Sequence, residues 1–488
     1  MPMASFTRRL APQGFDPSGI AASPSATVPL AVLLGGFLGV ALVAKPTVVV
    51  ALVALVLALI GIGVAFVRPD LAFGGLVVLL ALVPTYASPS IGPLLFIPTA
   101  AASWVLGGAL MWRNMITEGV FFRPNYVDYA VGAFVLLMTV SVGFSEQVVF
   151  TDLVHIMFMW AGPYLAARLL LSKVESPVRL VAISFAAMTV VLAPVAVSEA
   201  LGGSNPFFNF NFNSGEFGLW ASQIDRFGEV RAVTSFGHPI SFSMFLACSA
   251  LLSIAMGISS SEAKARYIWY ALAVVAVGTM ALALSRTGWV MLAVGVVVLA
   301  VITIRGTIRT RLITLLAIVV GVVLVTSVVM PNELQVIPGL GGSGEANYKS
   351  SGLYREALLE RALEPGVLNL WGNPTNQVTP NVQYGTATDN AYIILADEWG
   401  LIPTFALFSV VIAMLVAIGA SYGLRGEPIA ILPIVALTCL VAIFFVAFIT
   451  QGQVMIWLAI GAAGAAAERI TAQRKQRRLD QRRSSVRG

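Results

Sequence analysis

Apolar stretches of roughly 20 residues recur along almost the whole of this chain, and a helix of that length just crosses the hydrocarbon layer of a bilayer. Short breaks with turn or charge chemistry, such as Lys45-Pro46 and Arg68-Pro69-Asp70, separate the stretches. Only 11% of the 488 residues are charged, whereas a soluble protein carries about 25% because its surface faces water. The sequence therefore excludes a string of soluble domains and predicts an integral membrane protein.

The predicted fold is all-α. We expect a polytopic bundle of about 14 transmembrane helices, with about 12 as the alternative count, and a large external loop that contains a short amphipathic helix. The predicted spans are 28–44, 47–67, 71–86, 94–112, 127–144, 148–171, 178–198, 236–257, 267–285, 287–304, 311–330, 391–420, 428–449 and 453–468.

Basic residues predict the orientation, since loops on the cytoplasmic side of a membrane carry an excess of Lys and Arg. If the N-terminus is cytoplasmic, 22 of the 29 basic residues fall on the inner side, and both termini are cytoplasmic. We expect the first span to act as an uncleaved signal anchor, because no typical cleavable signal peptide precedes it. The basic residues left outside are Lys45, Arg226, Arg231, Arg286, Lys349, Arg355 and Arg361.

This topology divides the chain into successive parts. They are a mobile cytoplasmic leader (1–27), N-terminal membrane spans (28–198), an external loop (199–235), central spans that carry Arg286 (236–330), a large external loop (331–390), C-terminal spans (391–468) and a basic cytoplasmic tail (469–488).

The composition predicts neither a metal nor a cofactor. Cys248 and Cys439 lie in apolar runs, which is typical of small buried hydrophobes, and two histidines are too few for a His-rich metal site. The Gly-Leu-Gly of 339–341 lies in a loop and does not follow a strand, so it indicates no nucleotide fold. The basic run after Arg469 is most simply a topology anchor near anionic lipid. Because the run is short and lacks interleaved aromatic residues, no nucleic-acid partner is expected.

Two external segments, 199–235 and 331–390, are too long and polar to be simple connections. Loops of this kind are usually functional or disordered. Within the second segment, SSGLYREALLERALEPG predicts a short amphipathic helix over 352–364 that ends at Pro365-Gly366. The alternative is a covering loop without chemistry.

External arginines flank these loops against the orientation rule. Arg286 lies on a tight turn between two spans, where a permanently charged guanidinium costs free energy unless something compensates it. A guanidinium matches a pair of phosphate oxygens, so we expect Arg231, Arg286, Arg355 and Arg361 to bind a lipid-linked pyrophosphate at headgroup depth. The alternative for a single arginine is contact with lipid phosphates.

The segment TATDNAYIILADEWGLIP, residues 386–403, is the second candidate. Asp389 lies at the outer mouth of the span that follows, where it could act as a general base toward an incoming hydroxyl or simply cap the helix. Asn390 and Tyr392 are predicted substrate-binding residues beside it. Glu398 lies inside the predicted span, where a carboxylate is costly, so we expect an external arginine or another intramembrane ion-pair partner for it.

Other polar residues favour structural roles. Asp152 and His155 are three residues apart and share one helix face, which indicates a polar contact between helices more than a proton relay. Glu199, at the outer end of a span, is interpreted in the same way. His238 is predicted to start a helix, because Pro239 follows it at the first helical position.

The ordered set of these segments resembles the O-antigen ligase and O-antigen polymerase superfamily. The resembling pieces are RAVTSFGHPISFSMFL, LALSRTGWVML, the external loop with YREALLERAL, and TATDNAYIILADEWGLIP, which together cover about 230–420. The N-terminal half resembles the family only as a run of spans.

The resemblance implies a metal-independent, inverting glycosyltransferase in the bacterial plasma membrane. Such enzymes transfer glycan from a polyprenyl-pyrophosphate donor to a glycan acceptor at the external face, among membrane lipid and polysaccharide assembly proteins. Arg231 and Arg286 would then hold the pyrophosphate and neutralise the leaving group. Where the family usually has a histidine, this chain has Asp389, a carboxylate that could also accept the hydroxyl proton.

Ligases and polymerases of the family share these motifs, and two other classes stay open. A flippase or transporter of a polysaccharide precursor fits the number of spans, but transporters usually carry internal repeats or a polar site at the midplane. Here the polar residues gather at the outer face, which favours the enzyme. A non-catalytic component of a polysaccharide assembly complex is the third interpretation, and the departure at Asp389 is compatible with it.

Overall fold

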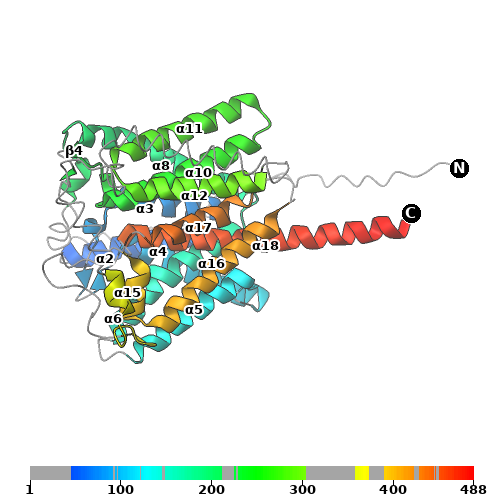
Figure 1. The fold of residues 1–488 in the computed structure, drawn as a ribbon, viewed down its shortest axis with the longest axis horizontal. Coiled ribbons are helices and arrows are strands. Elements are labelled where there is room, and N and C mark those ends of the chain that lie inside the picture. Colours follow the sequence, from blue (N-terminus) through cyan, green and yellow to red (C-terminus); the bar gives the residue numbers. More distant parts are fainter. Residues whose placement is uncertain are drawn as a thin grey trace, which may run out of the picture. The chain divides into compact units, whose positions relative to one another are not determined.

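The computed structural model describes residues 46–88, 90–91, 94–95, 97–120, 122–144, 149–210, 225–226, 229–303, 358–372, 390–422, 428–444, 446 and 450–487. The chain divides into two units, 1–60 and 61–488. Of the first unit, the described part is the beginning of helix α2 (Pro46–Val67). All that follows concerns the second unit (Figure 1).

Helices make up nearly all of the described part. They are α3 (Pro69–Leu82), α4 (Pro98–Glu118), α5 (Tyr126–Val142), α6 (Val149–His155), the π-helical η3 (Ile156–Ala161), α7 (Gly162–Ser172), α8 (Pro177–Ala200), α10 (Pro239–Ser259), α11 (Ala263–Leu282), α12 (Arg286–Thr303), α15 (Ala391–Glu398), α16 (Leu401–Ser421), α17 (Ile431–Ala442) and α18 (Thr450–Arg487). Two antiparallel hairpins of two-residue strands, β1 (Ser90–Ile91) with β2 (Leu94–Leu95) and β3 (Asp225–Arg226) with β4 (Glu229–Val230), complete it.

Proline marks the start of several helices. Pro69, Pro98, Pro177 and Pro239 are the first residues of α3, α4, α8 and α10. Proline suits this position because its missing N–H would have no partner in the first turn and its φ angle is already helical. The local sequence therefore fixes where these apolar helices begin.

Seven described helices are long and apolar enough to cross a membrane: Phe150–Ser172, Pro177–Ala200, Pro239–Ser259, Ala263–Leu282, Arg286–Thr303, Leu401–Ser421 and Gln451–Ser485. Four shorter apolar helices accompany them: Leu57–Val67, Pro69–Leu82, Tyr126–Val142 and Ile431–Ala442. The described residues thus have the helical architecture of a multi-pass membrane protein. The expected count of about 14 spans is not reached within them, and the predicted spans 28–44 and 311–330 lie outside the described ranges.

The predicted single span 391–420 is wrong. The chain breaks between α15 and α16 at Gly400, whose φ of 102° is unfavourable for a residue with a side chain. There, Leu401 N donates to Asn369 O (2.9 Å) and Ile402 N donates to Leu370 O (3.1 Å), so the returning loop replaces the helical bonds. The hydropathy averaged over 391–420 does not reveal this break, because Asp397 and Glu398 stand alone among apolar residues.

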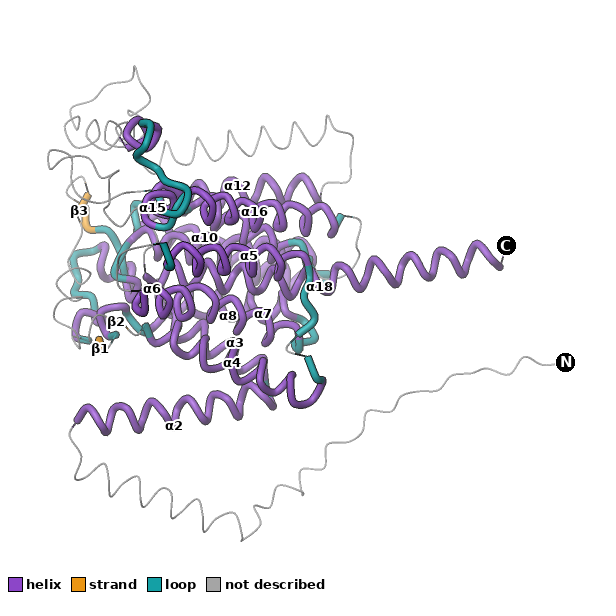
Figure 2. Tube along the Cα trace, turned by 90° about the horizontal axis from the view of Figure 1, so that it is seen from below, coloured by secondary structure: helices purple, strands orange, loops and turns teal. Residues whose placement is uncertain are grey.

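The helices run between two ends of the unit (Figure 2). At one end, which we call the tail end, α18 contacts the termini of its neighbours. Asn125, which caps α5, donates to Gly464 O (2.9 Å), and Arg474 donates to Gly419 O near the end of α16 (3.2 Å). Both hairpins and α15 lie at the opposite end, which we call the loop end. The basic helix and the loops predicted to be external thus occupy opposite ends.

A buried ion network joins α5, α7 and α18 near the tail end. The Arg168 side chain, 2% exposed, donates from Nε to Asp128 (3.0 Å) and from Nη1 to Glu468 (2.7 Å). Tyr164 Oη donates to the same Asp128 carboxylate, which also accepts from Asn125 N (2.7 Å). Arg168 was assigned to the inner side by the charge pattern, and in the structure it cross-links three helices.

Candidate functional site

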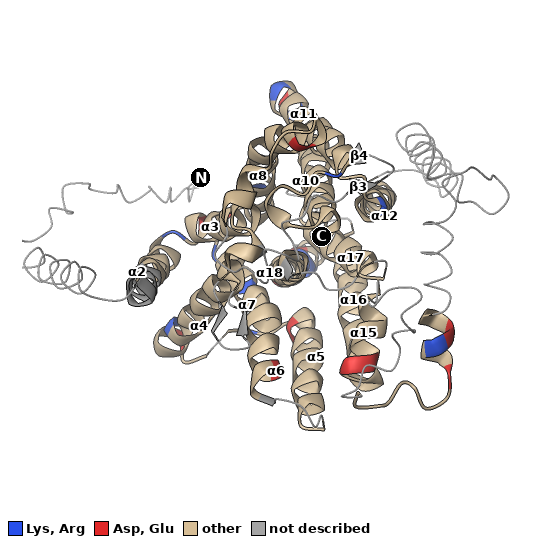
Figure 3. Cartoon of the chain, turned by 90° about the vertical axis from the view of Figure 1, so that its left-hand side faces the viewer, with Lys and Arg blue, Asp and Glu red and all other residues tan. Residues whose placement is uncertain are grey.

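Two of the predicted site arginines, Arg231 and Arg286, lie on adjoining turns at the loop end. Arg231 follows β4, and its Nε donates to Ala283 O (3.2 Å) in the turn between α11 and α12. The next residue, Ala232, donates its N–H to Leu282 O (3.0 Å). Arg286 is the first residue of α12, three residues after Ala283. Figure 3, which looks onto this end, shows the blue of Lys and Arg on the backbone beside β4 and on α12.

The two turns share an unusual backbone conformation. Among the described residues, only Thr234 (φ 50°) and Leu284 (φ 45°) combine a side chain with a positive φ. Thr234 follows Arg231 by three residues, and Leu284 precedes Arg286 by two. For a β-branched residue this conformation is a genuine outlier, and such strain persists where the surroundings impose it, often at functional sites. Both outliers lie within three residues of one of the two arginines.

A buried carboxylate holds the Arg231 turn in place. Glu199, 4% exposed at the end of α8, accepts hydrogen bonds from Val233 N (3.1 Å) and Thr234 N (2.8 Å). Asn205 donates both to Glu199 (2.7 Å) and to Thr234 O (2.8 Å). The predicted contact of Glu199 with another membrane helix is not what the described residues show, because its partners are Asn205 and the main chain of the turn after Arg231. In the sequence, the only indication of this role of Glu199 is that a single acidic residue ends an apolar span.

Replacing Glu199 by alanine is expected to release the Arg231 turn. The amides of Val233 and Thr234 would lose a charged acceptor, and such bonds contribute about 1.5–3 kcal/mol each. We expect their hydrogen exchange to accelerate at least about tenfold, since about 1.4 kcal/mol corresponds to a factor of ten. Glu118→Ala, at an exposed carboxylate, is the control and should leave these amides unchanged. Equal protection of residues 233 and 234 in both variants would contradict the role of Glu199.

His238 starts α10 as predicted. Its Nδ1 accepts from Ile240 N (3.3 Å), directly after Pro239 at the first helical position. Burial, together with the positive charge of Arg231, lowers the pKa of His238 to about 4. The imidazole is therefore neutral near pH 7, with Nδ1 as an acceptor, so its remaining proton is on Nε2.

Asn390 and Tyr392 position α15 on the end of α17. The Asn390 side chain caps α15 by accepting from Tyr392 N (2.9 Å) and Ile393 N (3.3 Å), and Tyr392 Oη donates to Leu440 O (2.9 Å). These polar atoms thus have structural hydrogen bonds, and contact with substrate stays a prediction for both residues. Asp389, the predicted base, and Arg355 lie outside the described residues.

Glu398 does not lie inside a span, and no arginine is among the charges that act on it in the described part of the chain. It is the last residue of α15, a helix of eight residues, and its expected ion pair stays a prediction, because Arg355 lies outside the described residues. Although part of its side chain reaches the surface, burial of the carboxyl and the charges of Asp397 and Asp152 raise the pKa of Glu398 to about 7. Glu398 thus lies at the loop end, where α15 ends before the break at Gly400.

Arg361 lies on the loop helix, of which residues 358–363 are described. Its guanidinium forms an ion pair with Glu364. The apolar side of this helix carries Leu358 and Ala362, which belong to a small cluster packed against Ile393 of α15. The predicted amphipathic helix is thus present over 358–363, and substrate contact by Arg361 stays a prediction.

Of the pair Asp152 and His155, the histidine has a partner on another helix. Gln453 Nε2 of α18 donates to His155 Nε2 (3.4 Å), which confirms a polar contact between helices. The six-residue π-helix η3 follows His155 directly, and π-helical turns are rare and frequent at functional sites. Apolar periodicity does not reveal a π-helix, and it was missed.

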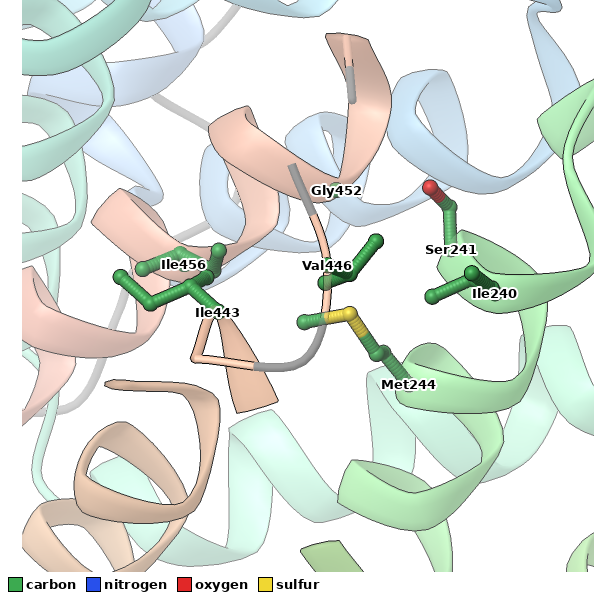
Figure 4. Close-up of a pocket in the computed structure, with 7 residues that line it drawn as sticks. All are labelled: Ile240, Ser241, Met244, Ile443, Val446, Gly452 and Ile456. Atoms are coloured by element: carbon green, nitrogen blue, oxygen red, sulfur yellow. The ribbon is translucent and has the colours of Figure 1, made fainter. Parts of the chain in front are cut away.

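A small cavity lies between the start of α10, the end of α17 and the start of α18 (Figure 4). Its volume of about 10 Å³ is enough for one water molecule at most. Ser241 points toward Gly452, and Met244 lies beside Val446. Because a pyrophosphate cannot fit there, the cavity is a packing gap and not the donor site. Within the described residues, no three His, Cys, Asp or Glu side chains form a group that could hold a metal ion.

No protein-family model matches the chain, and no curated protein sequence matches it significantly.

Proposed function

We propose that the protein is a membrane glycosyltransferase that polymerises or ligates oligosaccharide from a polyprenyl-pyrophosphate donor at the external face of the bacterial plasma membrane. One observation supports the proposal. The Arg231 guanidinium donates a hydrogen bond to the carbonyl oxygen of Ala283, in the turn that leads to Arg286, the first residue of α12. Two cations on strained, adjoining turns at the loop end are suited to a diphosphate whose lipid tail stays in the bilayer.

The proposed reaction needs charge stabilisation and one proton acceptor. The acceptor hydroxyl attacks the anomeric carbon on the side opposite the pyrophosphate, and the bond between that carbon and the phosphate oxygen breaks. Arg231 and Arg286 neutralise the charge that grows on the departing pyrophosphate. The carboxylate of Asp389 takes the hydroxyl proton. Arg355 and Arg361 bind donor or acceptor from the loop helix, and Asn390, Tyr392 and Glu398 line the acceptor side.

Arg286→Ala tests the proposal most directly. With purified protein in nanodiscs and a polyprenyl-pyrophosphate oligosaccharide, glycan transfer should fall about 100- to 1,000-fold, the usual loss when one transition-state donor is removed. Arg286→Lys should recover only part of it, because an ammonium lacks the planar fork.

Arg266→Ala is the matched control, since Arg266 is an exposed arginine at the opposite end of α11 and its loss should leave transfer unchanged. Normal chain growth by the Arg286→Ala protein would refute the assignment. If the unaltered protein moves the lipid-linked sugar between leaflets without lengthening any glycan, the flippase alternative takes its place.

A further inference from the structure

The last part of α18 extends beyond its neighbours at the tail end. Residues 471–485 are all exposed, and Arg474, which donates to Gly419 O (3.2 Å), lies level with the end of α16. The 13 residues from there to Arg487 span about 20 Å at 1.5 Å per residue. Figures 1 and 2 show this part of α18 running past the ends of the other helices.

Three of its arginines lie along one side of the helix. Arg474, Arg478 and Arg482 are four residues apart and so share one face. Gln481 and Ser485 lie on the same side of the helix as Arg478 and Arg482. On the other side, Gln476 donates to the carboxylate of Asp480 (3.2 Å). We call the side with Arg474, Arg478 and Arg482 the basic face.

Lipid headgroups can neutralise only the inner end of this face. The apolar helices around α18 end near Arg474, so the membrane boundary lies close to that residue. Attraction between exposed charges is screened beyond about 8 Å at physiological salt. Arg482 is eight residues, or about 12 Å, further out. The predicted role as a lipid anchor therefore suits only the beginning of the basic run.

The composition of this segment also restricts the partner. No aromatic residue follows Trp457 in the chain, so the helix offers no ring for base stacking, which usually strengthens binding to single-stranded nucleic acid. Leu479 is the only exposed large hydrophobic residue there among those described, at 42%, which is too little for the continuous apolar seam of a coiled coil.

We propose that the basic face of α18 binds an acidic helix of a soluble protein. Carboxylates four residues apart on such a helix would match Arg478 and Arg482, which lie beyond the membrane boundary, and each guanidinium can bind a carboxylate through two parallel hydrogen bonds. An interaction of this kind is fast to form and sensitive to salt. It is independent of glycan transfer, because it lies at the end opposite to Arg231 and Arg286.

The full chain in nanodiscs of neutral lipid allows a direct test. The probe is a fluorescent helical peptide of about 20 residues that carries glutamates four apart on an alanine background, and binding is followed by anisotropy. We expect the peptide to bind, and Arg478→Glu to weaken it about tenfold or more, because that change places like charges in contact. Arg483→Glu makes the same change of charge about 140° around the helix and should weaken binding less than about threefold.

Three results would overturn the proposal. The first is that the peptide does not bind. The second is that both variants lose the same affinity for the peptide. The third is that an RNA hairpin or anionic vesicles bind more tightly than the peptide, and that Arg478→Glu weakens this binding as much as it weakens peptide binding. Both variants alter an exposed side chain, so size-exclusion profiles like that of the unaltered protein are expected. A difference between the two variants therefore reports on the basic face.

Discussion

Arg168→Ala is expected to destabilise the protein by about 3–5 kcal/mol, the usual result of removing one partner from a buried ion pair. Asp128 would keep Tyr164 Oη and Asn125 N as donors but lose the guanidinium that neutralises it. Glu468 would lose the same partner. Unfolding in mixed micelles, followed by tryptophan fluorescence, measures the loss.

Two variants show whether the charge itself is the cause. Arg179→Ala removes an exposed arginine at the same end and should change stability by less than about 0.5 kcal/mol. The double variant Arg168→Met with Asp128→Asn removes both charges of the buried pair. It should recover about half of the free energy of unfolding that Arg168→Ala loses, because no unpaired charge of this pair stays buried. A double variant as unstable as the sum of its single changes would contradict the pairing.

Gly461→Ala is expected to destabilise the contact between α18 and α7 by about 1–3 kcal/mol, the usual cost of overpacking. A Cβ at residue 461 would collide with the carbonyl oxygen of Tyr164 and lie 2.9 Å from Ala167 Cβ. Both are parts of a helix that cannot move aside alone, so α18 must shift. Small residues at such positions let membrane helices approach closely.

Gly278→Ala should act in the opposite direction. No atom lies within 4 Å of a Cβ placed on this exposed glycine of α11, and alanine is favoured over glycine inside a helix by about 0.5–1 kcal/mol. Opposite signs for the two substitutions in the same unfolding assay would confirm that contact with α7 decides the result. A stabilised Gly461→Ala variant would contradict the packing of α18 against α7.

Apolar runs and charge positions predicted most of the described fold. The run after Pro177 and the run after Pro239 became α8 and α10 within three residues of their expected bounds, because in lipid every backbone group of a span must be bonded within the helix. The run 391–420 failed, since its break depends on the φ of Gly400 and on backbone bonds to a distant loop. Hydropathy predicts neither the φ angle of Gly400 nor these backbone hydrogen bonds.

The candidate site was predictable only in part. Arg231 and Arg286 were predicted as site residues because they are basic residues on the side that the orientation rule leaves poor in Lys and Arg. In the structure, the turns that carry them are joined by the hydrogen bond from Arg231 to Ala283 O. The carboxylate that fixes one of these turns, Glu199, was seen but not connected with them, because Val233 and Thr234 lie more than 30 residues away and bond through main-chain N–H groups. Hydrogen bonds from main-chain N–H groups cannot be predicted from residue types, because every residue except proline has such a group.

The continuity of α18 has a mechanical consequence. The helix is unbroken from Thr450 to Arg487, and near its first turns Gln451 donates to Leu80 O (3.1 Å) and Val83 O (2.7 Å) at the loop end. A torque applied beyond the membrane would therefore travel along one stiff rod, without a hinge to absorb it, to the opposite surface. Helix α18 also passes the start of α10, which follows the Arg231 turn in the sequence. A rotation of α18 at one surface of the bilayer would therefore also displace this part of the other surface.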